Sequence, residues 1–294
     1  MKFICPRCQN DLQEISEHEV FCPTDGLTFK QMDGIWRFLL PERESHYARF
    51  ISDYETVRRF EERGSPDSAY YRALPFQDLS GKFSADWKIR AASFRALQKI
   101  LTAESTVLDL GAGNGWLSNR LSLDGHTVSA VDLLVNPDDG LGAWRHYESR
   151  FARVQSEFTH LPFPDLSVSS VIFNASFHYS ENYEQTLAEA LRVLQTAGQI
   201  IIMDSPVYHD SASGEQMLAE RKESFISRYG IASDSIKSEG YLTFQRMKTL
   251  ANKFQLTWHH IRPFYGIRWA VRPWLARLRG AREPAEFGLW VGRR

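Results

Sequence analysis

The chain has 294 residues, of which 43% are hydrophobic and 24% are charged, as expected for a globular protein that buries a core. The formal net charge of −1 gives no reason to expect a polyanionic partner, and no apolar run reaches the length of a membrane span or of a signal peptide. All 3 cysteines lie near the N-terminus, too few for a disulfide framework, so we expect a cytoplasmic protein with reduced thiols.

Residues 1–40 form the first predicted unit, a small zinc-ribbon-like β module. Cys5-Pro-Arg-Cys8 places two thiols on one tight turn, and Cys22-Pro-Thr-Asp25 repeats that spacing with a carboxylate in the last place. Tetrahedral zinc sites favour thiolates and accept a carboxylate ligand. His18 is an alternative fourth donor, and a ribbon that has lost its metal is the alternative for the whole module. The expected ligands of one structural zinc are Cys5, Cys8, Cys22 and Asp25.

Residues 41–85 are expected to form a helical linker that caps the substrate. Hydrophobic residues recur there at helical spacing until Gly64 and Pro66 supply a stop. A second helical pattern begins after Asp86, near the start of the third unit, residues 86–294. The positions that define the first helix are Tyr47, Phe50, Ile51, Tyr54 and Val57.

Beyond residue 105 the pattern alternates between strands and helices. The strands are continuously apolar, which is typical of a parallel sheet covered on both faces. The helix that begins near Tyr183 has one apolar face and is expected to end at Gly198. This alternation predicts an α/β fold with a Rossmann-like, doubly wound, mostly parallel sheet, whose ligands bind beyond the carboxyl ends of the strands. The expected strands are residues 106–110, 128–132, 168–173 and 199–203.

Glycines after the first of these strands mark the expected ligand site. Gly111-Ala112-Gly113-Asn114-Gly115 leads into a helix and lets a ligand approach the backbone closely. A dinucleotide-binding turn would need a further glycine where Trp116 stands. Asp109 before the turn suits a cationic group, and Asp132 at the end of the next strand suits ribose hydroxyls. S-adenosylmethionine carries cationic groups and ribose hydroxyls, and it has no phosphate.

The glycine turn resembles the first motif of class I S-adenosylmethionine-dependent methyltransferases. Leu161-Pro-Phe-Pro-Asp165 is similar to a later segment of that family, and the likeness extends over residues 105–205. The branch that it resembles includes ubiquinone and menaquinone methyltransferase-like proteins. The resemblance implies a seven-stranded sheet with S-adenosylmethionine as the cofactor. The cofactor-binding residues that it implies are Asp109, Gly111, Ala112, Gly113, Asp132, Leu133, Glu157, Phe158 and Asn174.

The resemblance also implies roles for these residues. Asp109 would lie near the amino group of the cofactor, Asp132 would bind its ribose, and Leu133 would lie against its adenine. Glu157 would accept a hydrogen bond from the adenine edge, and the alternative for it is a solvated charge at a strand end. Phe158 stands where the family more often has alanine, so its side chain is expected to point away from the adenine.

His178 is the candidate catalytic residue. It lies in Asn174-Ala-Ser-Phe-His178-Tyr179, and an imidazole titrates near neutrality, so it suits a general base for an acceptor that must lose a proton. The alternative is that His178 packs against the following helix or caps it. Asn174 resembles the first residue of the Asn-Pro-Pro-Tyr motif of amino-group methyltransferases. Ala175 and Ser176 replace both prolines, which disfavours an amino group of adenine or glutamine as the acceptor.

The acceptor pocket is expected between residues 174–179 and 205–209. A helical insertion at residues 210–242, with its helix ending at Gly230, would close the pocket as a lid, and the alternative is that it covers nothing. Tyr70, Tyr71 and Arg72 would close the other side. Such an aromatic lining favours an aromatic or lipid-like acceptor.

The C-terminal part leaves the acceptor class open. Trp269 and Trp274 lie among its arginines. These residues could form a solvated face, or bind a lipid surface or a nucleic acid. The N-terminal ribbon resembles that of ribosomal-RNA guanine methyltransferases. We therefore consider a methyltransferase for a small-molecule or lipid-like acceptor, an RNA methyltransferase, and a protein that keeps the cofactor fold without turnover. The arginines are Arg262, Arg268, Arg272, Arg277, Arg279, Arg282, Arg293 and Arg294.

Overall fold

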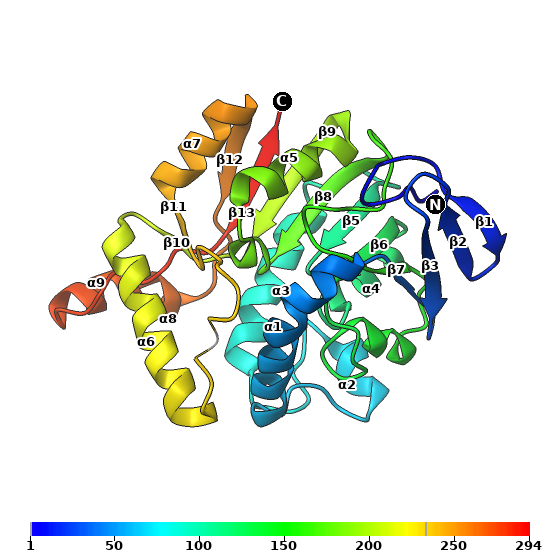
Figure 1. The fold of residues 1–294 in the computed structure, drawn as a ribbon. Coiled ribbons are helices and arrows are strands. Elements are labelled where there is room, and N and C mark those ends of the chain that lie inside the picture. Colours follow the sequence, from blue (N-terminus) through cyan, green and yellow to red (C-terminus); the bar gives the residue numbers. More distant parts are fainter. Residues whose placement is uncertain (1, 233) are drawn as a thin grey trace.

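The computed structural model describes residues 2–232 and 234–294, and an eleven-stranded sheet runs through them (Figure 1). The strands follow the order β1-β2-β3-β4-β7-β6-β5-β8-β9-β13-β12 across the sheet. Their bounds are β1 Gln13–Ser16, β2 Glu19–Cys22, β3 Leu27–Met32, β4 Ile35–Arg37, β5 Thr106–Leu110, β6 Thr127–Asp132, β7 Ala152–Gln155, β8 Val168–Asn174, β9 Leu194–Met203, β12 Thr257–Ile261 and β13 Leu289–Arg293. A separate two-stranded pair joins β10 (Val207–Tyr208) to β11 (Leu242–Thr243).

Seven of these strands, from β7 to β12 across the sheet, form the Rossmann-like part. The neighbours β7, β6, β5, β8 and β9 pair in parallel, whereas β13 is antiparallel to both β9 and β12. This confirms the seven-stranded, mostly parallel sheet. The strand order reverses direction at β5, so the ligand crevice is expected at the carboxyl ends of β5 and its neighbours.

Helices cover both faces of the sheet, which explains its continuously apolar strands. Leu108 and Leu110 belong to one hydrophobic core with α5 and α7, while Val107 belongs to the other with α2, α3 and α4. None of the helices in the described ranges is long and apolar enough to cross a membrane. The helices are α1 Pro41–Phe60, α2 Ser68–Ala73, α3 Ser84–Gln98, α4 Trp116–Leu123, α5 Tyr183–Val193, α6 Ser211–Tyr229, α7 Phe244–Phe254, α8 Ile267–Ala270 and α9 Arg272–Leu278, with short 3-10 helices η1 Leu141–His146 and η2 Phe177–Tyr179.

The N-terminal strands continue the main sheet. β4 pairs in parallel with β7, where Trp36 lies opposite Val154. Phe3 packs against Phe38 and Phe163, with ring centroids 4.9 Å and 5.8 Å apart. The cysteine-bearing segment therefore shares a core with the larger fold.

Besides Gly64, two glycines were expected to end helices, and one of these two expectations is wrong. α6 ends at Gly230, whose φ of +70° is the left-handed conformation that glycine favours. α5 instead ends at Val193, because Leu194 pairs with Val168 and begins β9. Gly198 lies inside that strand, where a Cβ would stand 2.6 Å from the Leu194 side chain.

Candidate functional site

The turn after β5 brings the backbone close to the space above it. Gly111, Gly113 and Gly115 have positive φ angles of +77°, +55° and +76°. A Cβ on Gly111 would lie 2.3 Å from the Ser176 Cβ, so no side chain fits there. Trp116 follows in α4 and is buried, which fills the place of the third glycine of a dinucleotide turn.

Asp132, the last residue of β6, is bonded to this turn. Its Oδ2 accepts a hydrogen bond from the Gly113 N–H at 2.7 Å, and its Oδ1 accepts one from the Leu134 N–H at 2.8 Å. Burial raises the pKa of Asp132 to about 6, although these N–H donors oppose the shift. Each carboxylate oxygen keeps a lone pair for a ligand hydroxyl.

Two buried acceptors near the turn lack a donor. Ser118 Oγ donates to Asp109 Oδ2 at 2.7 Å, but Asp109 Oδ1 has no partner among the described residues. The same holds for Asn174 Oδ1 at the end of β8. Burial raises the pKa of Asp109 to about 7. Because an unsatisfied buried acceptor costs about 1–3 kcal/mol, each of these atoms is suited to accept a hydrogen bond from a ligand group or a water.

A cavity, here called the main cavity, opens at the carboxyl ends of β5, β6 and β8. The strand ends line it on one side and α1 lines it on the other. Phe158 lies on its wall and packs edge-on against Phe173, with ring centroids 5.5 Å apart. The wall includes Gly111, Gly113, Asp132, Leu133, Glu157, Phe158, Ala175, Ser176 and Tyr179 from the sheet side, and Arg43, Tyr47, Phe50 and Tyr54 from α1.

A second hollow, here called the arginine recess, adjoins the main cavity and shares the glycine turn and Tyr54 with it. Arg58 Nε pairs there with Asp139 Oδ2 at 3.1 Å. Arg90 forms no ion pair with a carboxylate of the described ranges, so its guanidinium is available to an anionic group of a ligand. The charged and aromatic residues of the recess are Tyr54, Arg58, Arg63, Tyr70, Trp87, Arg90 and Asp139.

The walls of these two hollows contain eight of the nine expected cofactor residues. Asp109 is the exception, because it lies buried behind the glycine turn. Ala112 and Asn174 line the arginine recess, and the other six line the main cavity. The arrangement brings the set together, and the role of each residue stays a prediction.

Glu157 is buried and bonded to several side chains, which differs from a solvated strand-end charge. Arg43 donates to both of its oxygens at 2.8 Å, Tyr47 Oη donates to Oε2 at 2.9 Å, and His160 Nδ1 lies 3.0 Å from Oε1. Burial raises the pKa of Glu157, but the hydrogen bonds from His160, Arg43 and Tyr47 outweigh it and hold the pKa at about 2. Sequence reasoning missed Arg43 and Tyr47, although their spacing of four residues on a helix places them on one face.

His178 is buried, and the structure favours its packing alternative. Its Nδ1 lies 3.3 Å from Ser205 Oγ, and it lines neither the main cavity nor the arginine recess. Burial lowers its pKa to about 3, with the charges of Arg221 and Arg90 acting in the same direction. A neutral imidazole of such low basicity is poorly suited to take a proton.

The cover of the main cavity is α1, and the expected lid helix lies elsewhere. α6 contributes no residue to the walls of the two hollows, and among the described residues 210–232 and 234–242, Ile236 reaches the main cavity. α6 is held to the C-terminal segment, where Arg282 pairs with Glu220 at 2.7 Å, and to the end of α1, where Tyr229 stacks on Phe60. Tyr70 lines the arginine recess as a wall residue. The expected walls Tyr71, Arg72 and residues 205–209 line neither hollow in the described chain.

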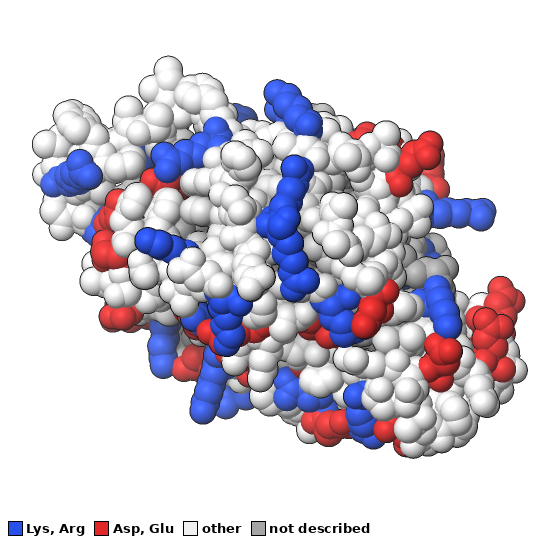
Figure 2. Space-filling model, turned by 90° about the horizontal axis from the view of Figure 1, so that it is seen from above, with Lys and Arg blue, Asp and Glu red and all other residues white. Residues whose placement is uncertain are grey.

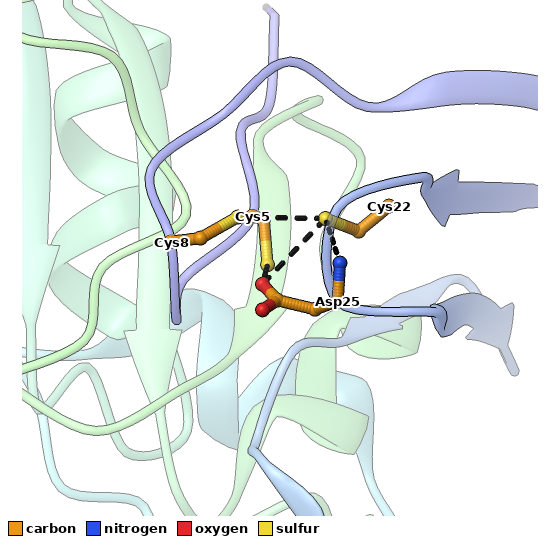
Figure 3. A group of neighbouring side chains, drawn as sticks. All are labelled: Cys5, Cys8, Cys22 and Asp25. Atoms are coloured by element: carbon orange, nitrogen blue, oxygen red, sulfur yellow. Dashed lines mark hydrogen bonds between the residues drawn. The ribbon is translucent and has the colours of Figure 1, made fainter.

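The four expected metal ligands come together in the N-terminal module (Figure 3). One ligand atom from each of these residues lies within 4.8 Å of the others. Cys8 Sγ is 3.5 Å from Cys22 Sγ, and Cys5 Sγ is 3.1 Å from Asp25 Oδ2. His18 lies outside the cluster, with its Nδ1 2.8 Å from Gln31 Oε1. Three thiols and one carboxylate at this spacing fit a tetrahedral zinc ion.

The first cysteine turn also contacts the helix that covers the main cavity. Arg7, between Cys5 and Cys8, pairs with Glu42 in the first turn of α1, with Nη2 2.5 Å from Oε2. Arg43, the next residue of α1, holds Glu157 in the cavity wall. A metal that fixes this turn would therefore also fix the start of α1.

Known proteins share this fold and its central motif. Residues 108–202 match a family described as a methyltransferase domain. Over 129 residues the chain is 31% identical to the demethylmenaquinone methyltransferase of Thermus thermophilus, a match that covers 42% of this chain and 57% of the relative. The chain spans about half the length of the curated relatives it matches.

Two solved structures share the fold alone, at low identity. A Galdieria sulphuraria protein described as a sarcosine dimethylglycine methyltransferase aligns with a TM-score of 0.53 and 15% identity, covering 82% of this chain and 98% of that one. A Haloferax volcanii complex of the Trm112 methyltransferase activator with a methyltransferase gives a TM-score of 0.52 and 17% identity, covering 73% of this chain and 92% of the matched one.

The strand order, the glycine turn and the family match define a class I S-adenosylmethionine-dependent methyltransferase fold. Residues 108–202, which match the methyltransferase-domain family, contain the glycine turn, Asp132, Glu157 and Asn174.

Proposed function

We propose that the chain transfers a methyl group from S-adenosylmethionine to a small-molecule or lipid-like acceptor. One observation carries the proposal: Gly111 tolerates no Cβ, and the carboxylate of Asp132 faces the same cavity. When bound, S-adenosylmethionine supplies a methyl group already activated on a sulfonium, so the protein mainly has to position the reactants and exclude water.

The walls of the two hollows suit the parts of this cofactor. Asp132 would accept hydrogen bonds from the ribose, while Leu133 and the backbone N–H of Phe158 would contact the adenine. Asn174 Oδ1, which lacks a donor among the described residues, would accept one from the ammonium group. Arg90 would meet the carboxylate in the arginine recess.

Glu157 would have two tasks. Arg43 and Tyr47 already bind it, so it positions α1 over the cavity in addition to its expected contact with the adenine edge. Asp109 would act through the glycine turn, since it is buried behind that turn.

Aromatic rings near the cavity mouth favour an aromatic or lipid-like acceptor. Phe50, Tyr54 and Tyr179 form a cluster with ring centroids 5.8 to 6.3 Å apart, and all three line the main cavity. The name of the Thermus thermophilus relative, which acts on a demethylmenaquinone, agrees with this class. His178 remains a predicted base only for an acceptor that must lose a proton, and its low pKa disfavours it.

A screen with methyl-labelled cofactor tests the function. We expect label on quinol-like or other lipid-like acceptors and none on bulk RNA. Labelled RNA together with nucleic acid that copurifies would favour the RNA alternative. Cofactor binding without any label transfer would favour the non-catalytic alternative.

We also propose that the module of residues 1–40 binds one zinc ion through Cys5, Cys8, Cys22 and Asp25. The clustering of these side chains supports the proposal, and zinc would supply the cross-link between the two cysteine turns. Residues 41–85 would be the helical linker and residues 86–294 the methyltransferase unit. A reducing cytoplasmic setting suits the free thiols of the module. Elemental analysis after chelator-free purification should find about one zinc per chain, as expected for a single four-ligand site.

A further inference from the structure

Large apolar side chains form an exposed stripe on α8 and α9, here called the apolar stripe. Four of them lie four, three and four residues apart in α8, α9 and their junction, which keeps them on one side of the helical path. The fifth, Phe264, precedes α8. The Val271 N–H bonds to the Ile267 carbonyl and the Leu275 N–H to the Val271 carbonyl, so the helical path continues between α8 and α9. The stripe consists of Phe264 (75% exposed), Ile267 (75%), Val271 (38%), Trp274 (62%) and Leu278 (66%).

Arginines flank the apolar stripe. Residues 262–282 contain six arginines and no aspartate or glutamate. Arg268, Arg277 and Arg279 are exposed, and no carboxylate of the described residues forms an ion pair with them. Arg268 follows Ile267 in the chain, and Arg277 and Arg279 enclose Leu278. α9 lies at the left edge of Figure 1. The left end of the molecule in Figure 2 is white and blue, without the red of acidic residues.

The other side of the segment is fixed to the fold, so the apolar stripe is held outward. The Trp269 ring packs against Tyr265 and Phe287, with centroids 5.3 Å and 5.1 Å away. The Arg272 guanidinium lies 3.2 Å from the centre of the Trp269 ring and donates to the Ala285 carbonyl at 2.7 Å. Exposed apolar side chains that gather on one side of a helical segment mark an interaction surface.

We propose that α8 and α9 dock the protein on an anionic lipid surface. The apolar stripe would enter the boundary between headgroups and acyl chains, with Trp274 at the headgroup level, while Arg268, Arg277 and Arg279 meet anionic headgroups. The proposal does not depend on methyl transfer, because the surface is distinct from both hollows of the candidate site.

Other occupants fit this surface less well. A second copy docked by twofold symmetry would bring two sets of unpaired arginines together, which is electrostatically unfavourable. A nucleic acid would use the arginines and Trp274, but would leave Ile267, Val271 and Leu278 exposed to water.

Vesicle flotation of the full chain without cofactor tests the proposal. We expect binding to vesicles of phosphatidylcholine mixed with phosphatidylglycerol, little binding to phosphatidylcholine alone, and weakening by salt. Trp274→Ser combined with Leu278→Ser should lower the partition coefficient about tenfold or more, because apolar burial is lost. Arg277→Gln and Arg279→Gln should each lower it about fivefold, the equivalent of ~1 kcal/mol per charge.

Leu123→Ser on α4 is the matched control, since Leu123 is 61% exposed but lies outside the apolar stripe. Its partition coefficient should equal that of the unmodified chain. Failure to bind the anionic vesicles, or equal loss with Leu123→Ser, would overturn the proposal. Two other results, each without vesicle binding, would assign the surface to another partner. A dimer that Trp274→Ser disperses in sedimentation velocity would assign it to a second copy, and RNA binding lost only with the arginine variants would assign it to a nucleic acid.

Discussion

Arg43 of α1 binds Glu157, two residues beyond β7, through two parallel hydrogen bonds of 2.8 Å, one to each carboxylate oxygen. Arg43→Ala would leave a buried carboxylate without its cationic partner. We expect a loss of about 2–3 kcal/mol in the free energy of unfolding. Cofactor affinity should fall as well, because α1 is no longer held over the main cavity. Denaturant unfolding and calorimetric titration measure the two effects.

Arg49→Ala is the control on the same helix. Arg49 is exposed and only loosely paired with Asp53, at 3.6 Å, so its removal should change the unfolding free energy by less than about 0.5 kcal/mol. Similar losses for the two variants would show that the pair with Glu157 has no special part in holding α1.

The pKa of Glu157 gives a prediction for acid unfolding. Its folded pKa of about 2 lies below its unfolded value of roughly 4.3, so the ionised group stabilises the fold at neutral pH and the effect is lost as the pH falls from about 5 toward 2. The chain should therefore lose stability more steeply over this range than Glu157→Gln. Comparing the two isolates Glu157 from Asp109 and Asp132, whose raised pKa values act in the opposite direction. Parallel pH profiles from denaturant unfolding would contradict this.

Gly111→Ala should abolish cofactor binding while leaving most of the chain folded. The added methyl would collide with Ser176 at the turn, and its position faces the main cavity. Gly125→Ala is the matched control, because Gly125 also has a positive φ, of +90°, but has nothing within 4 Å of the added methyl. Both variants bear the strain of a positive φ, and Gly111→Ala adds the collision with Ser176, so titration should show lost affinity in Gly111→Ala alone. Equal affinities would mean that the glycine turn is not the cofactor site.

Much of this turn was predictable from the sequence, because its signals are local. The apolar run 106–110, the glycines and Trp116 adjoin one another, and the structure places the strand, turn and helix there. The four metal ligands were predictable for the same reason, because each pair lies within one turn and the second pair repeats the spacing of the first.

Contacts between distant segments were not predictable in this way. Arg43 and Glu157 are 114 residues apart, and the pairing of β4 with β7 joins segments more than 100 residues apart. The helical pattern of residues 210–242 predicted α6 correctly, but nothing local indicated that α1 would be the cover of the main cavity. Burial likewise set the low pKa of His178, and burial depends on the whole fold.

Arg7→Ala tests whether the cysteine module supports the cofactor site. Arg7 is not a predicted metal ligand, so the variant should keep its zinc while losing its pair with Glu42 in α1. We expect cofactor affinity to fall only a few-fold, because exposed ion pairs contribute little and this pair acts on the cavity through α1. Lys2→Ala, which removes an exposed pair with Asp11 in the same module, should change neither zinc content nor affinity. Loss of zinc with Arg7→Ala, or unchanged affinity, would refute the connection.

Calorimetric titration of S-adenosylmethionine into the chain and into Asp132→Ala tests the central claim most directly. The main cavity should bind the cofactor with micromolar affinity, and loss of the hydrogen bonds from the ribose should weaken binding by about 1–3 kcal/mol, or roughly 5- to 150-fold. Equal affinities for the two proteins, or a preference of the unmodified chain for a nicotinamide dinucleotide, would contradict the account.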